Sequence, residues 1–335
     1  MDKLIKNKLF FLLSGIVFVN SFSYSQVDLN KTAQSTMNFL LVSTSPKASA
    51  LGDAYTSIGS GSEAMFYNPA GLAAMQTKFD INLNYTGWVA DIKYLGGGVA
   101  WNLNEYGVVG INLLTVDYGT INGTSLTLDV GSDLGYIDDG EISNVGAYSI
   151  GVSYAKAISR EFLVGGTAKL VGQNLGVSVL ETGSKENNAS KLAFDAGVKY
   201  ITGFKGFMFG MSIRNFATNI KREIYDEQLP LIFSVGAAIN AMEVFYPEHD
   251  SPLFFAIDFN HQNNYSERVN IGLEYKMFDM VSLRGGYQTN RDLASWSGGI
   301  GLNQTIQEYN LEVNYSYSKF EIFDSVSRLS LLVSF

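Results

Sequence analysis

Residues 311–318, LEVNYSYS, decide the fold, because apolar and polar side chains alternate along them without a break. Leu311, Val313, Tyr315 and Tyr317 fall on one face, and Glu312, Asn314, Ser316 and Ser318 fall on the other. Side chains alternate between the two faces of a β-strand, so this pattern predicts a strand that lies between two different environments. Residues 268–276, 192–200 and 79–86 alternate in the same way.

Working outward, about fourteen segments of this kind follow one another from residue 79 to the C-terminus, separated by turn-rich residues. They cover roughly residues 79–90, 93–104, 106–118, 144–158, 161–176, 190–201, 206–217, 230–242, 252–262, 266–276, 280–288, 295–304, 308–318 and 326–335. The pattern predicts an all-β protein, a transmembrane antiparallel up-and-down β-barrel of about fourteen strands.

The lengths of the connections give an independent indication of topology. The second, fourth, sixth and tenth connections are short, at residues 104–106, 159–161, 202–205 and 277–279. The third and fifth connections are long, at residues 119–143 and 177–189. Outer-membrane barrels have short periplasmic turns and longer external loops, so the even connections are assigned to the periplasm. The eighth, residues 243–251, is longer than this rule predicts.

A soluble β-sandwich or propeller is the alternative, with the apolar face as its core. Two features favour the barrel. Aromatic residues on the apolar face gather near strand ends, as in the girdles at membrane interfaces. The polar face combines Gly, Ser and Asn with charges of both signs, which suits a crowded lumen. The charged residues are Asp195, Lys199, Arg214, Asp258, Arg268, Glu274, Arg284 and Glu312.

Composition agrees with a sheet that contacts lipid and excludes several functions. Charged residues make up 16% of the chain, which contains 19 Tyr, 22 Phe, 34 Gly and only 5 Pro. Because there is no cysteine, disulfides, thiolate metal sites and a cysteine nucleophile are excluded. The net charge is −9, whereas nucleic-acid binding needs a basic surface.

The N-terminus has the pattern of a secretory signal peptide. Residues 1–8 are basic, residues 9–19 form an apolar run, and Ser23 to Ser25 supply small residues for cleavage before Gln26. The apolar run is too short for a transmembrane helix, which needs about twenty residues. Without residues 1–25 the chain has 20 basic and 31 acidic residues, a net charge of −11. An exported chain of this kind can enter a membrane only as a closed barrel.

The last strand carries an apolar face that ends at the terminal residue. Leu329, Leu331, Val333 and Phe335 share that face. This arrangement resembles the C-terminal signal by which barrels are recognised for insertion, and it implies the barrel-assembly machinery as a partner.

The segment before the first strand carries two motifs, ASALGDAYTS at residues 48–57 and SEAMFYNPAGLA at residues 62–73. Together they resemble the plug of the FadL/TodX superfamily of outer-membrane barrels, and within it the PorV/PorQ-like branch. The resemblance implies a plug at residues 26–78 inside a barrel at residues 79–335. The motif residues are Leu51, Gly52, Asp53, Asn68, Pro69, Ala70, Gly71 and Leu72.

The plug motif also has a physical interpretation. Leu51, Gly52 and the small residues around them allow close approach to a barrel wall. Pro69 disfavours a helical conformation for Asn68, whose side chain can then bond its own backbone in a tight turn. The simpler alternative is that the segment seals the lumen and does nothing else.

Other candidate sites carry little chemistry. His249 and His261 are both expected in connections, with no catalytic triad or metal-ligand spacing around them. The acidic stretch Asp129 to Glu141 lacks the spacing of a known calcium loop and is expected to be a solvated external loop. Residues 96–98, three glycines, are expected to be a flexible or close-packed position of the wall. No enzyme activity, cofactor or metal is expected.

Two functions remain open. The resemblance to the PorV/PorQ branch implies a role in type IX secretion, with secretion-system components and exported proteins as partners. The resemblance to FadL implies a transporter of fatty acids or other hydrophobic small molecules. The chain is shorter than typical FadL transporters, and its long connections are polar and acidic, whereas capture of such a ligand needs an apolar surface. Sequence alone therefore favours the secretion role.

Overall fold

The computed structural model describes residues 35–126, 135–142, 145–180, 183–222, 225–249, 251–290, 296–320 and 322–335. The predicted signal peptide, residues 1–25, lies outside the described residues, as does the first part of the acidic stretch, residues 129–134. No helix within the described residues is long and apolar enough to cross a membrane.

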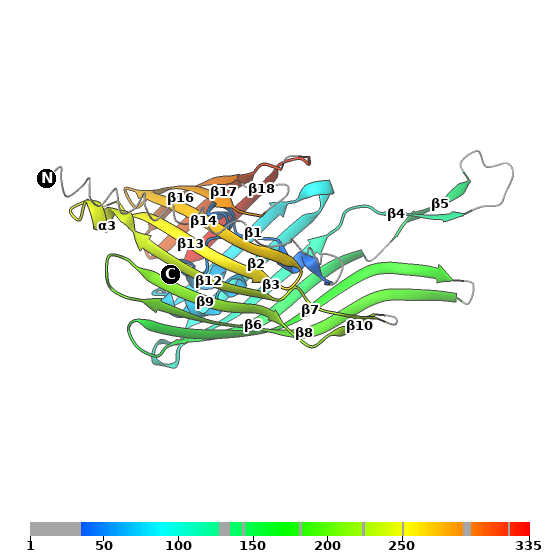
Figure 1. The fold of residues 1–335 in the computed structure, drawn as a ribbon, viewed down its shortest axis with the longest axis horizontal. Helices are drawn as coiled ribbons and strands as arrows, with labels where there is room; N and C mark the ends of the chain where they lie inside the picture. Colours follow the sequence, from blue (N-terminus) through cyan, green and yellow to red (C-terminus); the bar gives the residue numbers. More distant parts are fainter. Residues whose placement is uncertain are drawn as a thin grey trace.

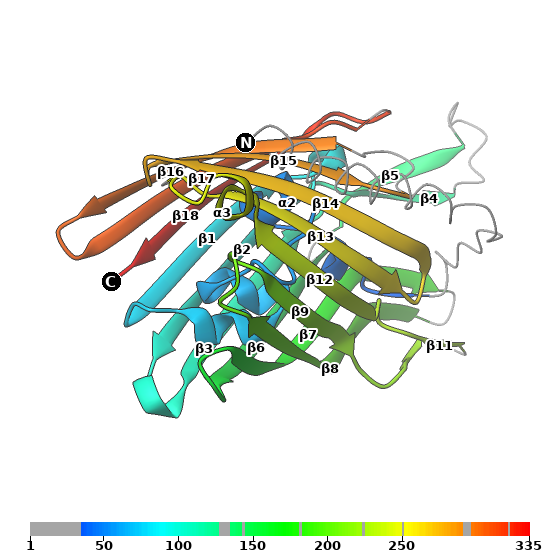
Figure 2. The same cartoon turned by 60° about the vertical axis from the view of Figure 1, so that its left-hand side comes forward.

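Fourteen antiparallel strands close into one barrel, as the alternating segments predict (Figures 1 and 2). They are β1 (Phe79–Gly87), β2 (Lys93–Asn102), β3 (Val108–Asp117), β6 (Val145–Ala157), β7 (Phe162–Leu180), β8 (Gly183–Ile201), β9 (Met208–Phe216), β12 (Ile232–Asn240), β13 (Leu253–Gln262), β14 (Tyr265–Met277), β15 (Val281–Gln288), β16 (Trp296–Ile306), β17 (Tyr309–Ser318) and β18 (Val326–Ser334). Each strand pairs with its neighbours in this order, and β18 pairs with β1, so the barrel has up-and-down topology and no free edge at the closure.

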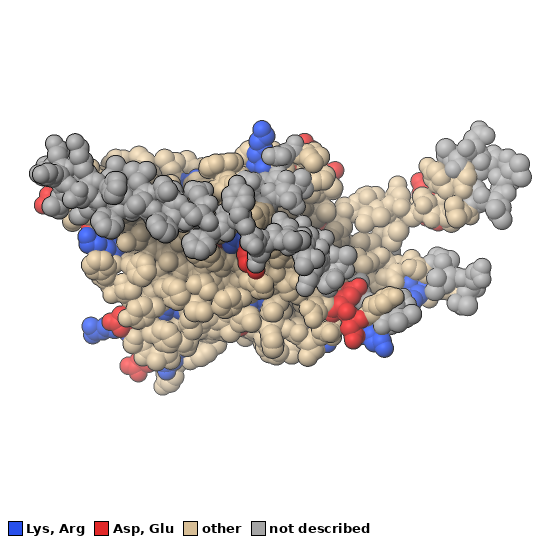
Figure 3. Space-filling view, in the orientation of Figure 1, with Lys and Arg blue, Asp and Glu red and all other residues tan. Residues whose placement is uncertain are grey.

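The alternation in sequence becomes an inside and an outside. On β17, Asn314 and Ser316 are buried in the lumen, while Val313 and Tyr315 are exposed on the outer surface. Most charged side chains on the face shown in Figure 3 gather toward the two ends of the barrel. An apolar outer band with every strand paired is the arrangement that lipid requires, because unpaired backbone groups have no partner there.

Aromatic side chains mark both ends of the outer band, as predicted. At one end, Phe335 packs against Phe79 and Tyr309, with ring centroids 5.3 Å away in each case. At the other end, Tyr287 and Trp296 lie 4.7 Å apart. Aromatic rings of this kind are typical of membrane interfaces.

The connections follow the predicted alternation of lengths. The end with short turns includes a 3₁₀ turn, η7 (Asn104–Tyr106), and a helix, α3 (Ala241–Phe245), which accounts for the unexpected length of the eighth connection. The other end carries two separate hairpins, β4 (Asn122–Leu126) with β5 (Tyr136–Glu141), and β10 (Ile220–Arg222) with β11 (Tyr225–Glu227). By the length rule this second end is the external one.

The fifth connection is not a loop, contrary to the sequence prediction. β7 and β8 continue their pairing across a bulge between Asn174 and Val177 and reach Leu180 and Gly183, so the hairpin projects beyond the barrel wall (Figure 1). Gly176, at a φ of 84°, supports the bulge. The alternation of apolar and polar residues fades here because this part of the hairpin contacts no lipid. The acidic stretch is corrected in part as well, since residues 136–141 form β5.

This topology predicts which residues a membrane-impermeant thiol reagent can reach. A cysteine at Ser125, in β4, should react on intact cells, because the hairpin projects from the external end. A cysteine at Ser159, in the short turn between β6 and β7, should react only after the cells are lysed. Reversed labelling of the two positions would overturn the orientation.

Residues 35–78, which precede β1, lie inside the barrel. Their helical elements are short: η3 (Asn38–Leu41), α2 (Pro46–Ala50), η4 (Gly61–Phe66) and η5 (Pro69–Ala74). A further turn, η6 (Val89–Asp91), belongs to the wall and joins β1 to β2. We call residues 35–78 the N-terminal segment. It begins at the external mouth, where Ser35 bridges to Gln228, and it ends where β1 starts.

Candidate functional site

The N-terminal segment packs closely against glycines of the barrel wall. Eight inward glycines on eight strands meet it so closely that an added Cβ would lie within 2.7 Å of its atoms. We call them the glycine belt: Gly98, Gly110, Gly165, Gly197, Gly210, Gly272, Gly286 and Gly299. Four of these glycines, on β7, β9, β14 and β15, meet backbone atoms of the segment, and the other four meet its side chains. Close approach of this kind is a common reason for glycine inside a strand.

The first plug motif packs against the belt at β14 and β15. Leu51 is buried against Gly272, and Gly52 lies against Gly286. Gly52 and Asp53 both have a φ of 61°, and only glycine adopts this left-handed conformation without cost. At Gly52 a Cβ would also lie 2.8 Å from the backbone nitrogen of Tyr287. Glycine is therefore required there for both conformation and space.

The second motif behaves as its sequence predicts. Asn68 is extended, with φ −143° and ψ 101°, and its Oδ1 accepts a hydrogen bond from the backbone N–H of Ala70 at 3.2 Å. Its Nδ2 donates to the carbonyls of Thr56 and Val198 at 2.9 and 3.0 Å, which ties the turn to β8. Ala70, Gly71 and Leu72 are buried in the same turn.

Polar side chains of the wall hold the backbone of the segment. Asp258 accepts from the N–H groups of Tyr55 and Thr56 at 2.9 and 2.8 Å. Four wall side chains donate to carbonyl oxygens of the segment: Gln288 to Gly52 at 2.8 Å, Lys199 to Gly59 at 2.8 Å, Arg214 to Phe66 at 2.9 Å and Arg328 to Ser43 at 2.8 Å. These bonds satisfy backbone groups of the segment, most of which lie between its short helices and have no regular secondary structure to pair them.

A buried group of ions joins α2 to the wall. The ammonium of Lys47 lies 2.7 Å from Glu312 on β17 and 3.3 Å from Glu63 on η4. Arg284 contacts Glu274 at 2.7 Å and Glu312 at 3.4 Å. Burial acts to lower the pKa of Lys47, but attraction to Glu312 and Glu63 outweighs it and raises this pKa above its ordinary value. Lys47 is therefore a cation at neutral pH.

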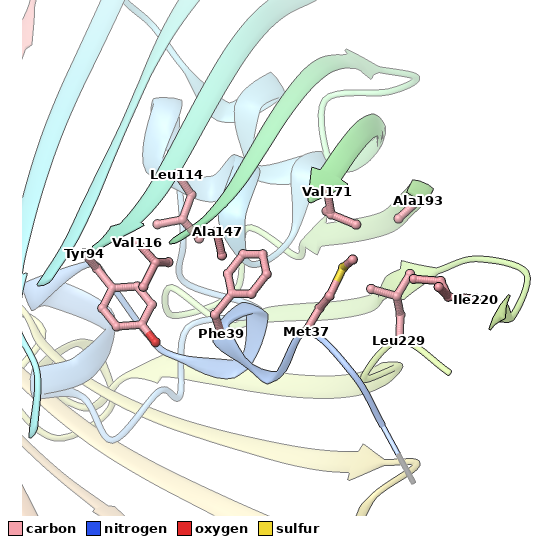
Figure 4. Packing of buried hydrophobic residues seen from close by; sticks show 10 residues of the cluster. All are labelled: Met37, Phe39, Tyr94, Leu114, Val116, Ala147, Val171, Ala193, Ile220 and Leu229. Atoms are coloured by element: carbon pink, nitrogen blue, oxygen red, sulfur yellow. The ribbon is translucent and has the colours of Figure 1, made fainter. Parts of the chain in front are cut away.

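The external half of the lumen is different, because apolar residues face inward there. Met37 and Phe39 of the N-terminal segment point into this apolar surface (Figure 4). The surface is formed by Tyr94, Leu114, Val116, Ala147, Val171 and Ala193 on β2, β3, β6, β7 and β8, with Ile220 and Leu229 beside it. We call the wall residues together with Met37 and Phe39 the apolar cluster.

A cavity of about 90 Å³ lies beside the apolar cluster, because Leu114 belongs to both. Leu40, Val42 and Phe66 line it on one side. Its polar lining includes Lys169, whose ammonium contacts Asp195 and the Asn215 Oδ1, each at 2.7 Å. The lining of the cavity therefore combines apolar side chains with charged ones.

The remaining predicted residues lie apart from this site. Leu329, Leu331 and Phe335 face outward on β18, so the location fits contact with lipid while their role in assembly stays a prediction. His249 lies in a connection, but His261 lies within β13, contrary to expectation, 3.3 Å from Glu267. Within the described residues no group of three or more His, Cys, Asp or Glu could hold a metal ion.

The three glycines at residues 96–98 are a close-packed wall position rather than a flexible one. A Cβ on Gly98 would lie 2.5 Å from the Met65 side chain of the N-terminal segment. A Cβ on Gly96 would meet Thr44 at 3.4 Å. The rest of the glycine belt and the apolar cluster were not singled out from the sequence. Their only signal was glycine and apolar residues at inward positions, where the alternating pattern calls for polar ones.

The closed barrel of fourteen antiparallel strands is a fold that this chain shares with solved outer-membrane channels. Solved structures with this fold include the Ralstonia pickettii toluene transporter TbuX, with TM-score 0.57 and 14% identity over 88% of this chain and 98% of that one. The monoaromatic hydrocarbon channel CymD has a TM-score of 0.55 and 12% identity, over 88% of this chain and 98% of that one. A Pseudomonas aeruginosa FadL homologue has a TM-score of 0.51 and 13% identity, over 88% of this chain and 97% of that one. No protein-family model matches the sequence, and no curated protein matches it. The fold agrees with the predicted location in the outer membrane.

Proposed function

We propose that the protein is an outer-membrane channel for hydrophobic small molecules, with residues 26–78 as its plug. The observation that carries this proposal is the apolar cluster. The lumen of an outer-membrane barrel is ordinarily polar. An apolar surface inside the external half of the lumen would not help water or ions to pass through a water-filled pore. It would instead bind a hydrophobic solute that transfers out of water.

Met37 and Phe39 occupy the surface that such a solute would use. Both side chains are nearly fully buried, and each gains about 1.5–3 kcal/mol from burial. A hydrophobic solute that replaced them would bury a similar area, so the exchange costs little. The plug below is held instead by ion pairs, hydrogen bonds and the glycine belt, which an apolar solute does not replace.

We infer that the N-terminal segment closes the channel at rest. The cavity of about 90 Å³ is well below the roughly 300–1,000 Å³ of ordinary ligand pockets. A solute can therefore enter this cavity only if residues 36–42 move. This external part of the plug is the one held mainly by apolar contacts.

Uptake by a strain that lacks the protein, complemented with variants, tests this proposal. Val116→Asn should reduce uptake of labelled toluene and oleate several-fold, because it places an amide in the apolar cluster. Val108→Asn is the matched control. It is equally buried and lies on the same face of β3, but it packs in a different cluster with Met65 and Leu72. Equal uptake of both solutes with and without the protein would reject the channel function.

A role in surface delivery of exported proteins through type IX secretion is the second candidate. The observation in its favour is the pair of projecting hairpins, β4–β5 and β7–β8 (Figure 1). A lone two-stranded hairpin is marginally stable, so a bound partner would stabilise β4–β5. Leu126 and Ile137 on it are 93% and 53% exposed. Loss of residues 122–141 should then change the surface proteome without changing uptake of toluene.

The polarity of the long connections no longer decides between the two functions. Those connections favour secretion in the sequence alone, because they offer no apolar surface to capture a ligand. In the structure the apolar surface lies inside the barrel and is contributed by strand residues such as Leu114 and Val171. The channel function therefore has the stronger support.

A further inference from the structure

We propose that the connection between β9 and β12 is a lid over the apolar cluster, that it opens together with the start of the N-terminal segment, and that Asn215 is its hinge. Its described residues are 216–222 and 225–230, which include β10 and β11, and we call them the lid. The inference rests on the proposed channel function, because it names a second part of the external half that moves when a solute enters.

The lid covers one end of the apolar cluster. Ile220 and Leu229 are 6% and 4% exposed, and both pack in this cluster with Met37. In Figure 4 Met37 lies between Phe39 and Leu229, so the lid and the N-terminal segment fill neighbouring parts of the same apolar surface. A solute that takes the place of Met37 would therefore contact the lid as well.

Backbone contacts tie the lid to the start of the N-terminal segment. The N–H of Thr36 donates to the carbonyl of Gln228 at 2.9 Å, and Ser35 forms a parallel β-bridge with Gln228. Moving residues 36–42 without the lid would break this bond and expose Leu229 to water, whereas moving both as one body keeps the bond and the apolar contact. Movement as one body is therefore the less costly way to open the external half.

The lid can move without opening the barrel. Within the described residues, β10 and β11 pair with each other and with no strand of the barrel. Side chains of the wall hold the lid instead: Lys191 donates to the carbonyl of Asn219 at 2.9 Å, and Asn263 donates to the carbonyl of Leu229 at 3.0 Å. Bonds of this kind contribute little net stability, because both partners can bond to water when they separate.

Asn215 has the properties of a hinge at the base of the lid. Its backbone is left-handed, at a φ of 63°, beside the register shift at the external end of the β8–β9 pairing. Its Nδ2 donates to the carbonyl of Pro230 at 2.9 Å, so this one side chain joins the two ends of the lid. Its N–H donates to Asp195 and its Oδ1 accepts from Lys169, each at 2.7 Å. A strained backbone persists only where surrounding bonds hold it, so loss of these bonds should release the lid.

Two cysteine pairs that share Ser35 test whether the lid and the N-terminal segment move as one body. Ser35→Cys with Gln228→Cys ties the segment to the lid. Ser35→Cys with Asn264→Cys ties it to the turn between β13 and β14, where the two native side chains lie 2.8 Å apart. The protein has no other cysteine, so a short reducible thiol cross-linker joins only the intended residues. We expect the first cross-link to leave uptake of labelled toluene and oleate unchanged, and the second to reduce it at least tenfold until the cross-link is cleaved.

The other outcomes of the cross-linking are equally decisive. If both cross-links stop uptake, the N-terminal segment leaves without the lid and the inference is wrong, while the channel function stands. If neither stops it, Ser35 does not move relative to the wall, which also excludes the lid. If neither solute is taken up before cross-linking, the proposed function fails, and the hinge is then decided by labelling alone.

Labelling of a cysteine in place of Met37 tests the hinge without any solute. Met37 is 2% exposed, so an impermeant thiol reagent should reach Met37→Cys on intact cells only when the apolar cluster opens. Adding Asn215→Gly should speed this labelling at least fivefold, because it removes both side-chain bonds while glycine keeps the backbone conformation. Asn112→Gly is the matched control, since Asn112 also lines the cavity, is 4% exposed and donates to Ser153 of the wall. Equal labelling rates for the two variants would show that Asn215 does not hold the lid closed.

Discussion

Gly286→Val should raise the conductance of the purified protein in planar bilayers several-fold. A Cβ at this position would overlap the backbone of Leu51 and Gly52, and backbone cannot rotate away as a flexible side chain can. Overpacking of this kind costs about 1–3 kcal/mol at a well-packed position. Because strand pairing fixes the wall, we expect the N-terminal segment to leave its position and the lumen to open.

Gly285→Val is the matched control for this prediction. Gly285 is the preceding residue on β15 and faces outward, where an added Cβ would meet nothing within 4 Å. It changes the same strand by the same number of atoms without touching the plug. A Gly286→Val protein that inserts normally and conducts no better than the Gly285→Val protein would show that the glycine belt does not seat the plug.

Lys47→Met should lower the free energy of unfolding by about 3 kcal/mol, because removing one partner leaves a buried charge uncompensated. Lys47 lies between Glu63, whose side chain is fully buried, and Glu312 on the wall. Methionine keeps much of the volume and removes only the charge. The measurement is urea unfolding from lipid vesicles, followed by tryptophan fluorescence.

Lys276→Met provides the comparison. Its ammonium lies 3.9 Å from Glu274, and its side chain is 43% exposed, so screening by water leaves this pair worth about 0–1 kcal/mol. Similar losses for the two variants would mean that the plug contributes little to the stability of the barrel. A large loss confined to Lys47→Met would show that plug and wall unfold together.

The two variants separate the two ways in which the plug is held. Gly286→Val acts on shape and leaves the ions near Lys47 intact. Lys47→Met acts on charge and leaves the glycine belt intact. If both lower stability but only Gly286→Val raises conductance, the belt makes the seal and the ions supply the attachment.

Sequence by itself determined the barrel. Fourteen alternating segments matched fourteen strands, because a strand with lipid outside and a polar lumen inside must show a period of two. It also determined local turns, such as the extended Asn68 before Pro69, since these depend on neighbouring residues alone. Its prediction failed at residues 177–189, where no lipid imposes the period and the hairpin simply continues.

Only the tertiary structure decided how the plug and the wall fit together. In the sequence Gly286 and Gly52 are unrelated glycines, yet they come into contact once the barrel closes. Lys47 finds Glu312 across 265 positions of chain. The inward apolar residues on β2, β3, β6, β7 and β8 interrupt the polar face one strand at a time and form a surface only when the strands lie side by side. Periodicity reports which way each side chain points, whereas contact between distant segments depends on closure, register and the path of the plug.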